Sequence, residues 1–117
     1  GGFPIAAMHE EAEAMGLDVP KPPSIGASRR EAMEALWSAA GLRGVESRRV
    51  TVTRRFSDFG AYWATSMRGP TIGAVMAKVP APEVAALKER VRARLPADAE
   101  GGVTATATAN AVKGVKA

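Results

Sequence analysis

The residues best suited to chemistry in this sequence are its single histidine and one cluster of aromatic side chains. His9 precedes Glu10 and Glu13 on a predicted helix. It is either a general base facing a substrate or a histidine that lies on the helix surface or is partly buried. The aromatic cluster is Phe56, Phe59, Tyr62 and Trp63, of which the last three stand at helical spacing. They are either core residues or the wall of an apolar small-molecule pocket, because Tyr and Trp combine an apolar body with a polar end.

Two arginine pairs, Arg48-Arg49 and Arg54-Arg55, flank a predicted strand and could contact phosphates. The formal charge of +4 and the pI of about 10.0 hint at an anionic partner. However, no exposed aromatic residues alternate with these arginines, as they would on a single-strand binding surface. We therefore expect the arginines to face solvent or pair with acidic helices, and we expect no nucleic-acid partner.

Several kinds of chemistry are excluded by what the sequence lacks. There is no cysteine, so disulfides and thiolate catalysis are ruled out, and a cytoplasmic location is expected. No phosphate-binding loop, zinc-protease motif or nucleophile elbow occurs. We therefore expect no metal site, and we assign no catalytic residue. No apolar run is long enough to span a membrane. Acidic residues interrupt the apolar stretch near the N-terminus, so we do not expect it to be a signal peptide.

The first part of the chain predicts two helices joined by a proline-rich loop. Residues 4–16 have apolar residues at helical spacing, and residues 17–27 contain three prolines. Ser28 and Glu31 form a predicted capping box for the second helix. Its apolar stripe is Met33, Leu36, Trp37 and Ala40, and Gly41 supplies a left-handed stop.

The second part predicts a strand, three helices and a final strand. Residues 45–56 alternate as a strand, and Ser57 is a predicted cap for a helix over 58–68. A short helix over 71–79 and a further helix over 82–95 follow, and Ala and Thr alternate as a strand over 103–112. Two strands make a marginal sheet. We therefore expect either the rest of a larger sheet or self-association, such as dimer formation, through exposed strand edges.

Three stretches resemble a known enzyme family. They are AGLRGVE at 40–46, RFSDFGAYW at 55–63 and ATANAVKG at 107–114. In this order and spacing they resemble the C-terminal half of class I S-adenosylmethionine-dependent methyltransferases of the ubiquinone and menaquinone biosynthesis type. GGFP at 1–4 resembles the loop after the family's fifth strand. The likeness extends over nearly the whole chain, and with the missing initiator Met it predicts a truncated or processed chain.

The resemblance implies a Rossmann-like α/β fold, of which this chain holds the last two, antiparallel strands and about five helices. Its segments would be 1–27, 28–56, the helical insertion 57–96 and the last strand in 97–117. Nothing here matches the family's glycine-rich loop or its acidic cofactor ligand. The chain alone is therefore expected to bind no S-adenosylmethionine and to be inactive. Its expected partner is a small-molecule substrate, with these substrate-side candidates: Phe3, His9, Phe59, Tyr62 and Trp63.

Overall fold

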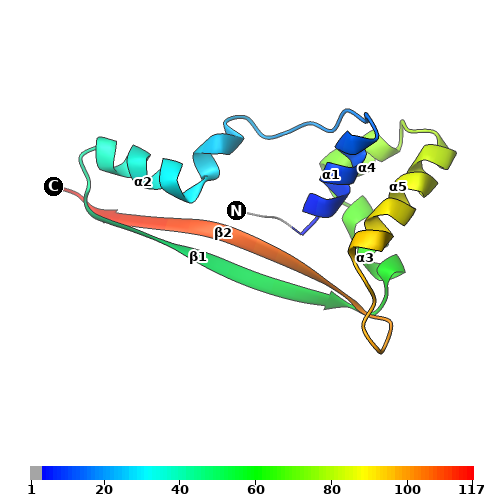
Figure 1. The fold of residues 1–117 in the computed structure, drawn as a ribbon. Helices are drawn as coiled ribbons and strands as arrows, with labels where there is room; N and C mark the ends of the chain where they lie inside the picture. Colours follow the sequence, from blue (N-terminus) through cyan, green and yellow to red (C-terminus); the bar gives the residue numbers. More distant parts are fainter. Residues whose placement is uncertain (1–3) are drawn as a thin grey trace. The chain divides into compact units, whose positions relative to one another are not determined.

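A computed structural model describes residues 4–117 and contains five α-helices and one two-stranded antiparallel sheet in that range (Figure 1). The predicted order of helices and strands is confirmed, and the fold is of the α+β kind. The elements are α1 (Ala6–Ala14), the 3-10 turn η1 (Ile25–Ser28), α2 (Arg30–Ala39), β1 (Arg43–Phe56), α3 (Phe59–Met67), α4 (Pro70–Met76), α5 (Ala81–Arg94) and β2 (Val103–Val115).

The described chain divides into two compact units. The first, which we call the hairpin unit, consists of Lys21–Val52 and Thr106–Ala117 and contains α2 with most of both strands. The name refers only to the antiparallel pairing of these strands, because α3, α4 and α5 separate them in the sequence. The second, which we call the helical unit, consists of Pro4–Pro20 and Thr53–Ala105. It contains the other four α-helices, the last residues of β1 up to Phe56, and the first residues of β2 from Val103.

Every buried apolar residue in the described chain belongs to the helical unit. The core joins α1, α3, α4 and α5 to the strand ends, and its members are Met8, Ala12, Val19, Phe56, Phe59, Tyr62, Trp63, Ile72, Met76, Leu87, Val91, Val103 and Ala105. In the hairpin unit no described residue is buried. Since burial of apolar surface is the main stabilising term in folding, the two units differ greatly in what holds them together.

The two paired strands have a defined register. Thr51 Oγ1 lies 3.2 Å from Thr108 Oγ1, and Lys113 Nζ lies 2.9 Å from Glu46 Oε2, so both pairs fit the same strand alignment. Successive side chains point to opposite faces of the sheet. α2 is tied to the face that carries Ser47 and Asn110. The other face carries Val50 and Val52, which are 42% and 61% exposed.

The end of α2 is as predicted, but its start is not. Gly41 has a φ of +85°, and the amides of Gly41 and Leu42 donate to the carbonyls of Ser38 and Trp37, which is the predicted left-handed stop. The capping box is wrong. Arg29 is the N-cap, without a side-chain cap bond, because Ser28 belongs to η1 and donates its hydroxyl to Ile25 O.

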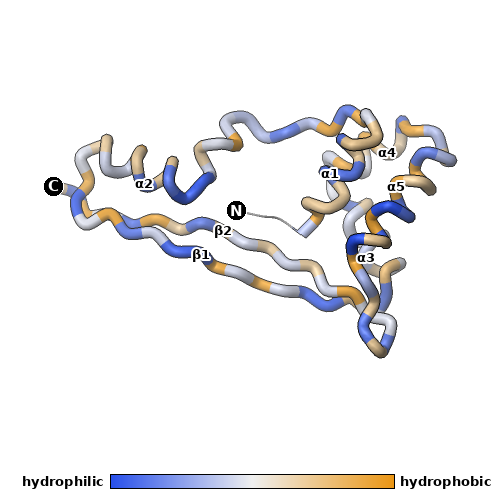
Figure 2. The backbone as a smooth tube through the Cα atoms, viewed as in Figure 1, coloured by the Kyte–Doolittle hydropathy of each residue, from blue (hydrophilic) through white to orange (hydrophobic). Residues whose placement is uncertain are grey.

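The cap of α3 also differs from the prediction. Asp58, and not Ser57, precedes the helix, and its Oδ1 accepts a 2.7 Å hydrogen bond from the Ala61 amide. A charged carboxylate is the stronger acceptor at a helix N-terminus, because it also complements the helix dipole. The strands run beyond their predicted ends, since β1 begins at Arg43 and β2 extends to Val115. Figure 2 shows the alternation of polar and apolar residues along the strands.

Candidate functional site

The aromatic cluster lies in the core of the helical unit. The ring centroids of Phe56 and Tyr62 are 5.4 Å apart in an edge-to-face arrangement. Phe59 lies 5.8 Å from Tyr62 and 6.1 Å from Trp63, again between centroids. These are favourable spacings for aromatic pairs. Phe59, Tyr62 and Trp63 are all at most 9% exposed, so the structure brings the three predicted residues together as core side chains.

Tyr62 connects this cluster to the start of α1. Its phenol donates a 3.1 Å hydrogen bond to the carbonyl of Pro4. Burial raises the pKa of the Tyr62 hydroxyl above its ordinary value, so the phenol stays a neutral donor. One turn further, Ser66 is buried, and its hydroxyl donates to Tyr62 O at 2.8 Å. The polar atoms of this part of the core are therefore used for structure.

His9 lies on α1 and is partly buried. Burial lowers the pKa of its imidazole, and the nearby Glu13 carboxylate opposes that shift. A histidine that is neutral at pH 7 has the protonation state a general base needs. The other predicted residue from this end of the chain, Phe3, lies outside the described residues. The structure thus places His9 on α1 and the predicted aromatic residues on α3.

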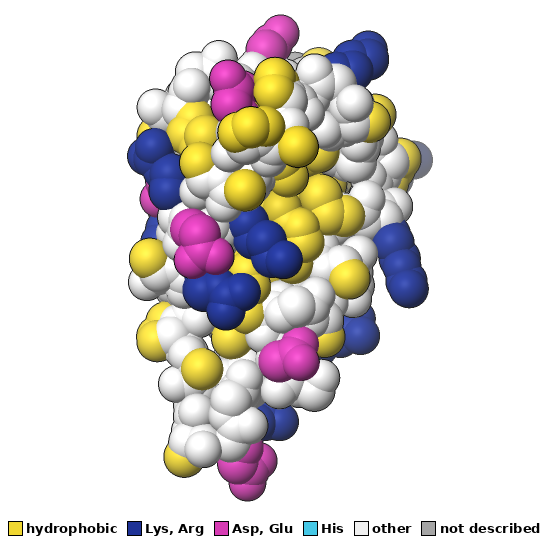
Figure 3. Space-filling view, turned by 90° about the vertical axis from the view of Figure 1, so that its right-hand side faces the viewer, with side chains coloured by type: hydrophobic (Ala, Val, Ile, Leu, Met, Phe, Trp, Pro, Cys, Tyr) yellow, Lys and Arg dark blue, Asp and Glu magenta, His cyan; other side chains and the backbone are white. Residues whose placement is uncertain are grey.

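Basic side chains cover the outer side of the aromatic cluster. Lys88 Nζ lies 5.9 Å from the Trp63 ring centroid, and the Arg92 guanidinium lies 4.7 Å from the Phe59 centroid. Such cation–π contacts let a long side chain cover an apolar ring while its charge stays hydrated. Figure 3 shows basic side chains lying across apolar ones on the helical unit. The rings are thus closed off by the chain's own residues.

The helical unit also has a cavity that the sequence did not predict. It lies between the loop after α1 and the helix α4, with a volume of about 500 Å³. Apolar side chains form most of its wall, and Asp18, Thr71 and Lys78 supply polar groups. The other lining residues are Leu17, Pro20, Ala74, Val75 and Val79. This size and mixture suit a small molecule. The apolar periodicity of residues 71–79 predicted a helix there. The loop that faces this helix has no periodic pattern, so the sequence could not predict the cavity between them.

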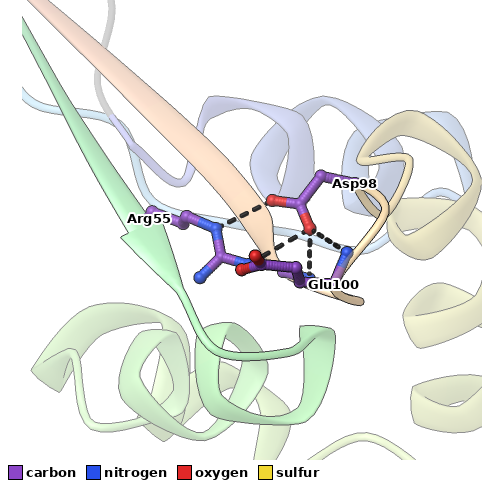
Figure 4. Close-up of polar contacts among 4 residues, drawn as sticks. Arg55, Asp98 and Glu100 are labelled. Atoms are coloured by element: carbon purple, nitrogen blue, oxygen red, sulfur yellow. Dashed lines mark hydrogen bonds and ion pairs between the residues drawn. The ribbon is translucent and has the colours of Figure 1, made fainter.

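A charged cluster fixes the loop between α5 and β2. Figure 4 shows Arg55 on β1 directed toward Asp98 and Glu100. Arg55 Nε and Nη2 donate to the two oxygens of Asp98 at 2.7 and 3.1 Å, and Glu100 lies 3.4 Å from Nη2. Asp98 Oδ1 also accepts from the amides of Glu100 and Gly102. The Arg55 bond and these amides hold the pKa of Asp98 far below its ordinary value.

Two of the four arginines considered for phosphate binding make contacts within the chain. Arg55 is paired with carboxylates, and the Arg54 guanidinium lies 4.6 Å from the Phe56 ring centroid.

Within the described residues, no three acidic or histidine side chains gather into a possible metal site. No helix in that same part of the chain has the length and apolar content to cross a membrane. No protein-family model matches the chain, and no curated protein matches it.

Proposed function

We propose that this chain is the substrate-side, C-terminal half of a Rossmann-like S-adenosylmethionine-dependent methyltransferase that acts on a small molecule in the cytoplasm. The proposal rests on the absence of a buried core among the described residues of the hairpin unit. An amphipathic helix and two long strands lie together there without one buried residue. Elements of this kind are stable when further strands and helices cover them.

The unpaired side of β2 fits a neighbouring strand. Each strand of the sheet pairs on one side only within the described chain. β1 carries six charged residues, which discourage further pairing. The stretch of β2 from 104 to 112 carries none. The free edge of β2 is therefore the side on which the sheet continues, and β1 is the outer strand. The antiparallel pairing of the two strands is what the resemblance implies for the last two strands of the family.

The helical unit supplies the substrate side of the proposed enzyme. It has its own core, so it can hold a fixed shape while the sheet beside it is completed. The 500 Å³ cavity beside α4 offers an apolar wall with a few polar groups for the methyl acceptor. Methyl transfer chiefly requires that the acceptor be aligned with the donor methyl. The methyl donor would bind the first half, because this chain lacks the family's cofactor-binding residues.

The test compares the 117-residue chain with the complete reading frame that encodes it. We expect calorimetry to show micromolar S-adenosylmethionine binding to the complete product and none to residues 1–117. The upstream sequence should contain a strand followed by a glycine-rich turn, about one domain length before Gly1. A complete product that binds no S-adenosylmethionine would overturn the proposal, as would micromolar binding by the 117-residue chain alone.

The same edge of β2 favours one alternative, a non-catalytic module that associates with itself. In that case a second copy pairs with β2, and light scattering shows a dimer at micromolar concentration. Ala109→Lys would place a charge in the uncharged stretch and should abolish the dimer. Arg48→Lys, which leaves the charge of β1 unchanged, is the control. A strict monomer at all concentrations would exclude this alternative.

A further inference from the structure

A second cavity lies in the hairpin unit, where the first turn of α2 meets the paired strands. Its volume is about 310 Å³, and residues of α2, β1 and β2 form its wall. The lining residues are Arg29, Arg30, Glu31, Arg49, Thr108 and Asn110. This volume is at the lower end for ligand cavities, which run from about 300 to 1,000 Å³. It suits a compact polar molecule.

Polar contacts fix the walls of this cavity. Asn110 Nδ2 donates to the carbonyl of Ser28 at 2.8 Å, which ties β2 to the start of α2. Arg30 Nη2 donates to the carbonyl of Ser47 at 3.0 Å, and Ser47 donates its hydroxyl to Glu34. These bonds hold α2 against the hairpin on both sides of the cavity. These bonds set the positions of the residues around the cavity.

The polar groups of this cavity that have no ion-pair or hydrogen-bond partner in the described chain suit an anion that carries a hydroxyl group. Neither Arg29 nor Arg49 forms an ion pair within the described residues, whereas Arg30 is engaged by Ser47 and Glu34. Asn110 Oδ1 is buried and accepts no hydrogen bond from the described chain. A buried acceptor without a donor is unfavourable, and a ligand hydroxyl would satisfy it. Guanidinium groups favour phosphate oxygens, to which they donate two hydrogen bonds.

We propose that this cavity binds a small phosphate monoester that carries a hydroxyl group. The phosphate lies between Arg29 and Arg49, and the hydroxyl donates to Asn110 Oδ1. The start of α2 adds to the attraction, because its first amides have no side-chain cap. Glu31 disfavours a bare polyanion and leaves room for a ligand whose second group is neutral. The site is independent of the proposed methyl transfer, since it needs neither the donor nor the cavity beside α4.

The test is a titration of the ¹⁵N-labelled 117-residue chain with glycerol 3-phosphate, followed by NMR at constant ionic strength. We expect saturable shifts at the amides of residues 29–31, 49 and 108–110. Inorganic phosphate and glycerol should each bind more weakly, because each offers only half of the recognised groups. Arg49→Gln should weaken binding by about tenfold, the typical loss for one charge-assisted contact.

Arg48→Gln is the matched control, because it removes the same charge from the neighbouring position, whose side chain points to the opposite sheet face. Far-UV circular dichroism of both variants checks that they fold alike. Equal weakening by the two variants would mean general charge attraction and would overturn the site. Absent or non-saturable shifts would also overturn it. Equal affinity for inorganic phosphate would overturn the role of Asn110. None of these outcomes bears on S-adenosylmethionine binding, so the two proposals fail separately.

Discussion

His9 and Asp98 give the folded chain two separate responses to acid. Burial lowers the pKa of His9, so the folded state binds its proton less readily than the unfolded state. The associated stability is present above the unfolded value near ~6.5 and is lost as pH falls below it. We expect urea titrations to show a decline in the free energy of unfolding as the pH falls below ~6.5, and His9→Gln should remove this decline.

The Asp98 response belongs to lower pH and serves as the control. Its lowered pKa stabilises the folded state above the unfolded value near ~3.9, and this stabilisation is lost as pH falls through the lower folded value. Asp98→Asn should therefore leave the decline near pH 6 intact and reduce the decline below about pH 4. If the decline near pH 6 persists in His9→Gln, His9 is not the titrating group.

Gly73 permits the close approach of α3 and α4. A Cβ at this position would lie 2.5 Å from the carbonyl oxygen of Met67, and a backbone atom yields less easily than a side-chain end. Gly73→Ala should destabilise the chain by about 1–3 kcal/mol in urea titrations, even though alanine is the better helix former. Gly26→Ala is the control, because nothing lies within 4 Å of its Cβ. A more stable Gly73→Ala variant would contradict the described packing of the two helices.

At the scale of helices, a leucine-to-alanine substitution distinguishes a helix whose apolar face is buried from one whose apolar face is exposed. Leu87 on α5 is 0% exposed, whereas Leu36 on α2 is 58% exposed. Leu87→Ala should cost about 2–5 kcal/mol, because it leaves a cavity in the core. Leu36→Ala should change the free energy of unfolding by no more than about 0.5 kcal/mol. Similar losses for both variants, measured by chemical denaturation, would show that the face of α2 is covered in solution.

The sequence predicted the existence and type of these elements better than their ends. The stripe of Met33, Leu36 and Trp37 predicted α2 because spacing is a property of the element itself. The two serine caps failed because other groups compete for the same positions. Ser28 bonds back to Ile25 within η1, and the Asp58 carboxylate caps α3 in place of Ser57. Such local competition depends on backbone angles that residue types alone do not determine.

The candidate sites were less predictable than the elements. The aromatic residues were found, since Phe59, Tyr62 and Trp63 do gather, but spacing could not distinguish a core from a pocket wall. The cavity beside α4 needs the loop at Leu17 to face Val75, and the hairpin cavity needs Arg49 beside Asn110. Both depend on contacts between segments distant in sequence. Only the pairing of the strands brings Arg49 and Asn110 together.

At the scale of the whole molecule, stability is concentrated in one of the two units. Amides open locally when few buried contacts hold them, and their exchange reports this unevenness. We expect the amides of α5 and α3 to be the slowest to exchange in hydrogen-exchange mass spectrometry. The amides of α2 and of the strand segments near Val50 and Ala109 should exchange much faster.

β1 supplies an internal control, because one of its ends lies in the core of the helical unit while the rest of the strand has no buried residue. Phe56 at its end is buried, whereas Val52 is 61% exposed, so protection should decline from Phe56 toward Arg43. Uniform protection along β1 would mean that something covers the hairpin unit. If that protection increases with protein concentration, the cover is a second copy, as the self-associating alternative requires. If it appears only in the product of the complete reading frame, the cover is the first half of the proposed enzyme.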